Sequence, residues 1–293
     1  MVIKMSKIKW YKLIFKQRSP MHIGKYRYGV ISETELIIPG HTMWGALVNY
    51  YGTKSGGTSE MYDKEKGNLK NLTCFYPSFD PKGNDVFFPT YKSADLHYGD
   101  FTEEWFRNKI TDTFISTSVE PVINAAKDST LHEIETILPK DKYDKKQIFW
   151  VGLVGLILDD NNSNEFIQDE AFSYFEHYPE IIVGGDGRYG LGRLQLEDYC
   201  KSSAEELTEW QIDIDGRFIN NRKAIKNYIT VQDISLIEGE YKTVFQYNYG
   251  DSSNNPQLAP NKYYLCYLPG SEVKINNESV FHLEKGIFKK TIN

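Results

Sequence analysis

The residues best suited to chemistry lie in one glycine-rich stretch. Five glycines and two arginines occupy residues 184–193, in the run GGDGRYGLGR. Glycine is unfavourable in ordered backbone unless the chain needs a positive φ or a close approach to another group. Open amides and guanidinium groups are typical partners of phosphate, and Tyr189 between the arginines is suited to stacking on a base. A tight bulged hairpin packed on the preceding helix is the alternative interpretation.

A GxGxxG pattern lies inside this stretch, at Gly185, Gly187 and Gly190. In a dinucleotide-binding fold the pattern follows the first strand and opens a helix whose N-terminus receives the pyrophosphate. Here the alternating segment RLQLEDY follows, which predicts a strand. The sequence also lacks the Gly-Lys-Ser/Thr run of a P-loop. Nucleotide-cofactor binding is therefore disfavoured, and we expect no cofactor.

A second candidate site is the run LIIPGHTMWGAL at residues 36–47. Its pattern predicts a strand, a Pro-Gly turn and the start of a helix, which together present open backbone amides to an anion. His41 and Thr42 stand at the rim of this turn, and we expect Thr42 to cap the helix. We expect the glycine-rich loop and this helix start to converge on a single cleft.

The spacing of the histidines and cysteines argues against a metal site and against a disulfide framework. The six histidines, at positions 22, 41, 97, 132, 177 and 282, show no HxH or HxxxH spacing. The three cysteines are far apart and form no CxxC pair, which argues against zinc and against a disulfide framework. His22 and His41 are the candidates for acid–base work on an RNA 2′-hydroxyl, although a loop histidine more often forms hydrogen bonds or stacks.

The elements that must position these residues are those of an α+β protein. Alternating or continuously apolar runs predict strands, and 3.6-residue spacing predicts helices. The strands are expected at residues 7–17, 31–39, 85–89, 146–160 and 193–199, the helices at 41–51, 102–110 and 163–178, and a long hairpin at 112–139 with its tip at 124–129. Residues 52–73 are polar and irregular and predict a mobile surface insertion that orders only in an assembly.

Charge and composition bound the function classes. The chain of 293 residues has 34 Lys and Arg against 40 Asp and Glu, a net charge of −6, so a nucleic-acid role needs local basic patches. Residues 1–27 supply one, because they contain eight basic residues and no acidic one. The 21 tyrosines suit stacking surfaces, although a β-rich fold also favours them. The longest apolar run, at 148–158, is too short for a bilayer, so we expect a cytoplasmic protein without a membrane partner.

The motifs, in their order and spacing, resemble those of the RAMP superfamily of CRISPR effector subunits. The resemblance covers roughly residues 7–200, and the matching runs are SPMHIG (19–24), IIPGHTMWGAL (37–47), SVEPVINAAKDSTLHEIETILP (118–139), IFWVGLVGLIL (148–158) and GGDGRYGLGRLQL (184–196). It implies a ferredoxin-like, RRM-type core over residues 1–200, with the insertion 52–73 and the hairpin 112–139. Residues 201–293 would be a β-rich C-terminal extension, or a second, degenerate RRM-like half.

The resemblance also implies RNA-binding residues and partners. The partners are crRNA, target nucleic acid indirectly through the guide, and other CRISPR effector subunits. The candidate RNA-binding residues are His22, Lys25, Tyr26, Arg27, Gly40, His41, Trp44, Lys127, Gly184, Gly185, Gly187, Arg188, Tyr189, Gly190, Gly192 and Arg193.

Two departures from the family pattern narrow the role. Trp44 stands where many members have a basic residue before the glycine, so stacking would replace a phosphate contact. The loop at 22–35 lacks the catalytic Asp of the RNA-cutting backbone subunits, and its only acidic residues are Glu33 and Glu35. The run KYYLCYLPGSEVKI at 262–275 resembles a segment of the subunits that cap the 5′ handle of the guide. We expect a non-catalytic capping subunit; the alternatives are a repeating backbone subunit and a metal-independent guide-processing endoribonuclease.

Overall fold

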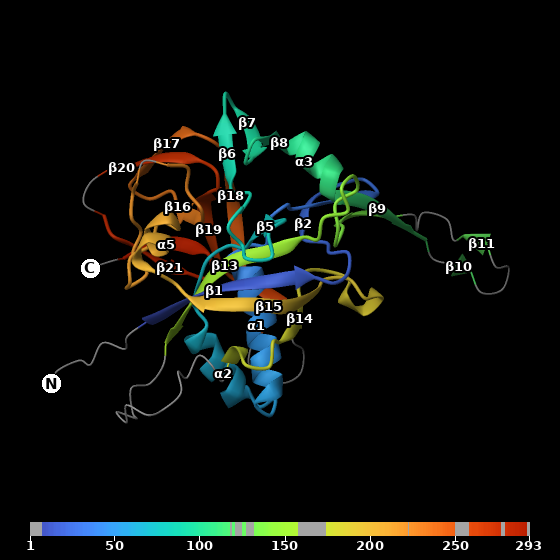
Figure 1. The fold of residues 1–293 in the computed structure, drawn as a ribbon, viewed down its shortest axis with the longest axis horizontal. Helices are drawn as coiled ribbons and strands as arrows, with labels where there is room; N and C mark the ends of the chain where they lie inside the picture. The colour runs from blue at the N-terminus through green and yellow to red at the C-terminus, as the bar shows by residue number, and fades with distance from the viewer. Residues whose placement is uncertain are drawn as a thin grey trace.

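A central antiparallel sheet organises the molecule (Figure 1). The computed structural model describes residues 8–117, 119–120, 125–126, 132–157, 174–221, 223–249, 258–276 and 279–291. The order of the central strands is β14 (Glu180–Ile182), β15 (Arg193–Lys201), β1 (Ile8–Gln17), β13 (Phe149–Ile157) and β4 (Asn71–Leu72), and β5 (Tyr76–Ser78) also pairs with β13. Every neighbouring pair is antiparallel.

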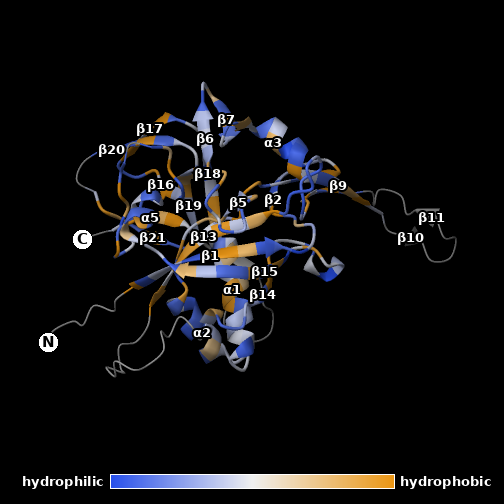
Figure 2. Cartoon of the chain, in the orientation of Figure 1, coloured by the Kyte–Doolittle hydropathy of each residue, from blue (hydrophilic) through white to orange (hydrophobic). Residues whose placement is uncertain are grey.

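The central strands form where the sequence predicts them. In β13 every residue from Phe149 to Leu156 is buried, which agrees with its continuous run of apolar residues. Figure 2 shows this apolar character as orange colour along β13. The strands predicted at 7–17, 146–160 and 193–199 are therefore confirmed, with ends that differ by a few residues.

Helix α1 (Gly40–Lys54) confirms the predicted helix and buries Met43, Leu47 and Tyr51. Its N-cap is Pro39, at φ −57° and ψ 142°, and no side chain caps it. The expectation that Thr42 caps the helix is wrong, because Thr42 lies inside the first turn. There its own amide donates to the Pro39 carbonyl at 3.0 Å.

The expectation of an irregular insertion at residues 52–73 is also wrong. This segment contains the end of α1, helix α2 (Ser59–Asn68) and strand β4. The Thr58 hydroxyl accepts a hydrogen bond from the amide of Met61 at 3.3 Å and so caps α2. Tyr62 lies against Gly52, where a Cβ would be only 2.3 Å from the ring. Packing on α1 therefore orders a helix whose polar composition gives little sign of it.

A second sheet extends away from the core in the order β2 (Gly24–Tyr28), β3 (Ile31–Thr34), β12 (His132–Ile137) and β9 (Thr111–Ser116). The antiparallel pairing of β9 with β12 confirms the predicted hairpin. Strands β10 (Val119–Glu120) and β11 (Ala125–Ala126) continue it, and the rest of the tip lies outside the described residues. The strand predicted at 31–39 ends at Thr34.

Smaller elements surround these sheets. Helix α3 (Glu103–Ile110) confirms the helix predicted at 102–110, and the Thr102 hydroxyl caps it. Of the strand predicted at 85–89, Val86 forms an isolated bridge and Pro89 begins β6. Strands β6 (Pro89–Lys92), β7 (Asp95–Tyr98) and β8 (Phe101–Thr102) form a three-stranded sheet. Most of the helix predicted at 163–178 lies outside the described residues. No helix in the described ranges has both the length and the apolar character needed to cross a membrane.

The chain beyond residue 201 is β-rich, as predicted. After helix α5 (Ala204–Glu209), the strands of this part are β16 (Tyr228–Thr230), β17 (Ile234–Glu238), β18 (Tyr241–Tyr249), β19 (Leu258–Tyr267), β20 (Glu272–Ile275), β21 (Phe281–Glu284) and β22 (Ile287–Lys290). Five of them form a sheet in the order β18-β19-β16-β22-β21, with β18 at its edge. Buried side chains from both halves of the chain form one continuous core.

A close backbone contact between the two halves joins the start of α1 to the turn between β21 and β22. A Cβ on Gly40 would lie 2.4 Å from the Cα of Gly286, a separation that real Cβ atoms essentially never show. On the same helix, a Cβ on Gly45 would meet nothing within 4 Å. These two glycines therefore provide a matched pair for measuring what the contact contributes.

We expect Gly40→Ala to lower the free energy of unfolding by roughly 2–4 kcal/mol, because the backbones must separate. Gly45→Ala should raise it by about 0.5–1 kcal/mol, because alanine favours a helix interior more than glycine does. Urea unfolding followed by circular dichroism measures both changes. Equal effects of the two substitutions would contradict the packing role of Gly40.

Candidate nucleic-acid interface

The glycine-rich loop joins β14 to β15 and contains the short 3-10 turn η1 (Gly187–Tyr189). Gly184, Gly190 and Gly192 have φ angles of 86°, 83° and 79°, which favour glycine over any residue with a side chain. Asp186 is also left-handed, at φ 57°. The left-handed backbone at Gly184, Gly190 and Gly192 therefore accounts for glycine at these three positions.

Two of the five glycines approach the protein's own backbone. A Cβ on Gly184 would lie 2.2 Å from the His22 carbonyl oxygen, and one on Gly192 would lie 2.0 Å from the Val183 carbonyl oxygen. The Gly185 amide also donates to the His22 carbonyl at 2.9 Å. Both ends of the loop therefore pack on the protein's own backbone. The helix predicted at 163–178, on which the alternative interpretation places the hairpin, lies mostly outside the described residues.

The tip of the loop has a different environment. A Cβ on Gly190 would meet nothing within 4 Å, and the Tyr189 side chain is 79 % exposed. Arg188 is exposed and forms no ion pair with any residue that the structure describes. The tip thus presents a guanidinium group and an aromatic ring to solvent, which is the combination expected for contact with a single-stranded nucleic acid.

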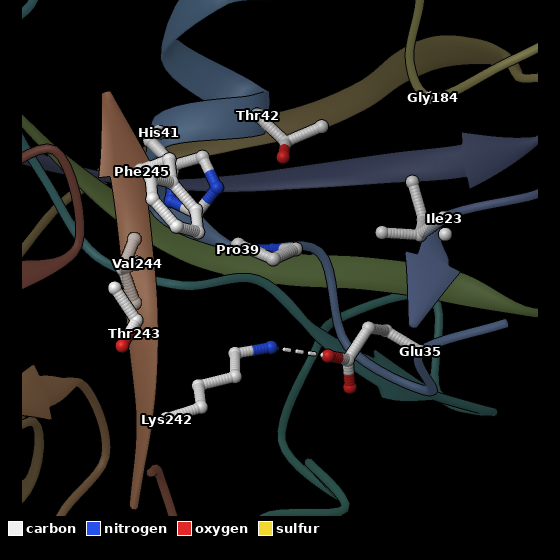
Figure 3. A pocket seen from close by; sticks show the side chains of 11 residues that line it. Ile23, Glu35, Pro39, His41, Thr42, Gly184, Lys242, Thr243, Val244 and Phe245 are labelled. Carbon is white, nitrogen blue, oxygen red and sulfur yellow. Dashed lines mark hydrogen bonds and ion pairs between the residues drawn. The ribbon is translucent and has the colours of Figure 1, made fainter. Parts of the chain in front are cut away.

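One residue of the glycine-rich loop, Gly184, lines a pocket together with Pro39, His41 and Thr42 at the start of α1 (Figure 3). The pocket has a volume of about 310 Å³. Its lining consists of Ile23, Gly24, Glu35, Pro39, His41, Thr42, Gly184 and residues 242–245 of β18.

Sequence reasoning missed the β18 wall. Lys242 and Phe245 come from the edge strand of the C-terminal sheet, about 200 residues beyond His41 in the chain, so local pattern gives no sign that they meet it. Lys242 forms an ion pair with Glu35 across the pocket (Figure 3). Alternation in β18 places Val244 in the core and leaves Phe245 46 % exposed at the pocket.

His41 has the most perturbed environment of the pocket residues. Burial, with further contributions from the positive charges of Lys242 and Lys285, lowers the pKa of its imidazole to about 4. Its Nδ1 atom is buried and has no hydrogen-bond partner among the described residues. His41 is therefore a neutral ring with unused hydrogen-bonding capacity at ordinary pH.

The other candidate histidine has a structural environment. His22 is only 8 % exposed, its Nδ1 lies 2.8 Å from the Glu135 carbonyl oxygen, and its Nε2 lies 3.3 Å from the Ser32 hydroxyl. Both ring nitrogens thus have partners on the second sheet. This arrangement fixes the segment against which the glycine-rich loop packs.

Two of the basic side chains that are predicted to contact RNA already form ion pairs within the protein. The Lys25 ammonium lies 2.9 Å from Glu33 and 3.0 Å from Glu103, and Arg193 pairs with Glu180 at 2.6 Å. Their charges are therefore compensated. Arg27 on β2 is exposed, and its Nε donates to the Gly29 carbonyl at 3.3 Å, which leaves most of its guanidinium group open.

The remaining candidates divide between surface and interior. Tyr26 is exposed on β2, with its ring 6.1 Å from that of Tyr28. Trp44 does not line the pocket; the Lys285 ammonium lies 3.7 Å from its ring centroid, so a cation of the protein itself occupies one of its faces. Gly40 approaches Gly286 rather than an open surface. Lys127 lies outside the described residues.

No protein-family model matches the sequence, and no curated protein matches it either. Solved structures do. A chain in the cryo-EM structure of the Type III-B Cmr-beta complex bound to cognate target RNA and AMPPnP is similar at a TM-score of 0.55 and 12 % identity, over 96 % of this chain and 99 % of that chain. A chain of the same complex bound to cognate target RNA alone is similar at a TM-score of 0.54 and 12 % identity, over 95 % and 99 %.

At this level of identity the likeness concerns the fold. It extends over nearly the whole of both chains, so the part beyond residue 201 belongs to the shared architecture. The chain therefore shares its fold with a chain of the Type III-B Cmr-beta complex.

The depressed pKa of His41 predicts a pH-dependent stability. The unfolded chain binds a proton to this residue near pH 6.5 and the folded chain only near pH 4, so protonation in this window favours unfolding. We expect the free energy of unfolding to fall by on the order of 1–2 kcal/mol more between pH 7 and pH 4.5 in the native protein than in His41→Gln. Urea unfolding at the two pH values measures the difference. The same pH dependence in both proteins would show that His41 titrates normally.

Proposed function

We propose that this chain is a non-catalytic crRNA-binding subunit of a CRISPR effector complex, which holds the guide backbone and caps its 5′ handle. Its likeness in fold to a chain of the Type III-B Cmr-beta complex supports this role. The observation that supports this most directly is the shared pocket of the glycine-rich loop and the start of α1. The start of α1 and the glycine-rich loop are about 140 residues apart in sequence, and both contribute to this one concave surface. Concave sites of this kind are the usual place of ligand binding.

The central sheet supports a ferredoxin-like, RRM-type core for this subunit. Taken in chain order, the four core strands are β1, β4 together with β5, β13 and β15. In the sheet β15 lies beside β1, β1 lies beside β13, and β13 lies beside β4 and β5, with all neighbours antiparallel. This is the arrangement of a split βαβ unit, in which α1 connects the first strand to the second. RRM-type sheets are a common support for single-stranded RNA.

The charges support local rather than global attraction of RNA. The net charge of −6 repels a polyanion overall, and Lys25 and Arg193 are compensated by carboxylates. Arg188 at the loop tip and Arg27 on β2 therefore provide the phosphate contacts in this proposal. Tyr189 and Tyr26 lie beside them in sequence and provide exposed rings for stacking.

The capping role rests on the part of the chain beyond residue 201. Strand β18 closes one side of the pocket, so the site is complete within a single chain. A subunit with a closed, self-contained site suits one end of the guide, whereas a repeating subunit must pass the RNA on to the next copy. The packing of Gly40 on Gly286 holds the β21–β22 turn against the start of α1.

A non-catalytic role is supported by the environments of the histidines. His22 has partners on both ring nitrogens, so neither is available to a ribose hydroxyl. His41 remains the single pocket histidine, and its low pKa makes it a poor general acid at neutral pH. Incubation of the pure protein with precursor repeat RNA, without metal, should leave the RNA intact. Cutting that disappears in His41→Ala would contradict this part of the proposal.

Arg188 and Arg193 provide a matched pair for testing RNA binding. We expect Arg188→Ala to weaken binding of a single-stranded guide by about 5- to 10-fold and to reduce the slope of log K against log salt by about 0.7, because one phosphate contact is lost. Arg193→Ala should change both quantities less, because Glu180 already compensates that charge. Fluorescence anisotropy over a salt series measures them. Equal losses for the two variants would rule out the loop tip as the contact.

The capping position predicts one copy of the chain per assembled complex and contact with one end of the guide. Ultraviolet crosslinking of the reconstituted complex should join this chain to nucleotides of the repeat-derived 5′ tag. Native mass spectrometry of the same sample gives the copy number. Several copies, crosslinked at regular intervals along the guide, would show a repeating backbone subunit instead.

A further inference from the structure

A group of lysines without acidic partners lies on the loop between β12 and β13, residues 139–147, which we call the lysine loop. Its lysines are Lys140, Lys142, Lys145 and Lys146. None of the four forms an ion pair with a residue that the structure describes, whereas Lys12, Lys25 and Lys242 pair with carboxylates. The lysine loop therefore presents uncompensated positive charge on a protein whose net charge is −6.

A buried carboxylate organises the backbone of the lysine loop. Asp141 is buried, and its carboxylate accepts hydrogen bonds from three backbone amides of the loop. The donors are Tyr143 at 2.9 Å, Asp144 at 2.7 Å and Lys146 at 2.8 Å. The ammonium of Lys109, from helix α3, lies 3.2 Å from the same carboxylate. These contacts define the backbone from which the four lysines extend.

A row of stacked aromatic rings ends at the same loop. The rings of Phe101 and Trp105 lie 4.2 Å apart between centroids with 17° between their planes, and those of Trp105 and Tyr143 lie 6.4 Å apart with 29°. Trp105 is 42 % exposed and Tyr143 is 63 % exposed. The buried Lys109 ammonium lies 5.3 Å from the Trp105 centroid and 5.4 Å from the Tyr143 centroid, so it packs against both rings. The outer end of the row offers ring surface for stacking.

Exposed rings beside unpaired lysines favour one class of ligand. A single-stranded nucleic acid has bases that stack on aromatic rings and phosphates that pair with lysine. An acidic peptide would pair with the lysines and leave the rings without a matching group. On α3, Glu104 is exposed beside Trp105, so phosphates are disfavoured along the helix and favoured along the loop.

The end of β1 and the residues after it join the lysine loop to the glycine-rich loop. The Gln147 side chain donates to the Gln17 carbonyl at 2.7 Å. The backbone amide of Arg193, at the end of the glycine-rich loop, donates to the Ser19 hydroxyl at 3.0 Å. Arg18, between these two contacts, is exposed and forms no ion pair with any described residue. Unpaired cations thus occur on both loops and on the segment that connects them.

We propose that the lysine loop, together with Trp105, is a second contact site for single-stranded RNA, separate from the tip of the glycine-rich loop. Bases stack on the exposed rings of Trp105 and Tyr143, and the four lysines pair with the phosphates. Arg18 lies on the path between the two sites. The proposal rests on the proposed function, because it gives the bound RNA a second point of contact.

The test uses the full chain and oligouridylates of about 4 to 16 nucleotides, a range that covers the usual site sizes for single strands. Fluorescence anisotropy over a salt series gives the dissociation constant and the slope of log K against log salt. The charge variant combines Lys145→Gln with Lys146→Gln. Its matched control combines Lys54→Gln with Lys64→Gln, which removes the same charge from exposed lysines of α1 and α2, away from α3 (Figure 1).

We expect the charge variant to weaken binding of the longest RNA about 25-fold at about 0.1 M salt and to reduce the slope by about 1.4, because two phosphate contacts are lost. The control should change both quantities much less. The affinity of the native protein should rise with RNA length once a strand reaches both sites, and the charge variant should lose that rise.

The aromatic contact is tested at Tyr143. Tyr143→Leu keeps an apolar group against Trp105 and should weaken binding of the longest RNA by about 5- to 150-fold, the range for loss of one stacked base. Tyr143→Phe keeps the ring and should retain the native affinity. Circular dichroism and urea unfolding of each variant check that the fold is intact.

Each possible failure has its own signature. Equal losses in the charge variant and its control, with binding still weakened by Arg188→Ala, would end this inference and leave the proposed function standing. Polyglutamate that displaces the RNA and binds Tyr143→Leu as tightly as the native protein would show that the lysine loop takes an acidic protein segment instead. Absence of RNA binding by the native protein at low salt, at every length, would remove the proposed function and this inference together.

Discussion

The structure depends on backbone contacts that are possible only because particular side chains are absent. At Gly40 the start of α1 touches the β21–β22 turn, and at Gly184 the glycine-rich loop touches the segment that contains His22. A Cβ at either point would enter the space of another backbone. These two contacts bring together the start of α1, the loop and the C-terminal half of the chain. The pocket is the space that remains between them.

This constraint changes the meaning of the glycine-rich loop. A loop rich in glycine is easily interpreted as a surface kept bare for a ligand, yet Gly184 and Gly192 are bare because the protein's own carbonyl groups lie against them. The part of the loop that is open to solvent is the short tip, where Gly190 has open space and Tyr189 is exposed. Backbone contacts at both ends of the loop thus hold the segment that carries Arg188 and Tyr189.

Charge compensation is the second general feature of the interface. Lys25, Arg107, Glu33, Glu103 and Glu135 form a connected network behind β2 and β3, and Lys242 and Glu35 pair inside the pocket. Paired charges attract a polyanion weakly. In our proposal, RNA binding at this surface therefore depends on backbone amides, exposed aromatic rings and the few open guanidinium groups. This pattern suits a subunit that holds a defined segment of RNA within an assembly more than one that binds RNA indiscriminately.

The sequence by itself determined the strands β1, β13 and β15, helix α1 and the hairpin of β9 and β12. It did so because hydrophobic periodicity and continuous apolar runs are local properties of a sequence. The resemblance of its motifs also predicted that the glycine-rich loop lies near the Pro-Gly helix start, and Gly184 does line a pocket with Pro39, His41 and Thr42. Only the tertiary structure decided that residues 59–68 are helical, since that helix depends on contact with α1. Tertiary structure likewise decided which cations are compensated and that β18 supplies Lys242 and Phe245 to the pocket. Partners distant in the chain set these properties, and no local pattern of residue types encodes a distant partner.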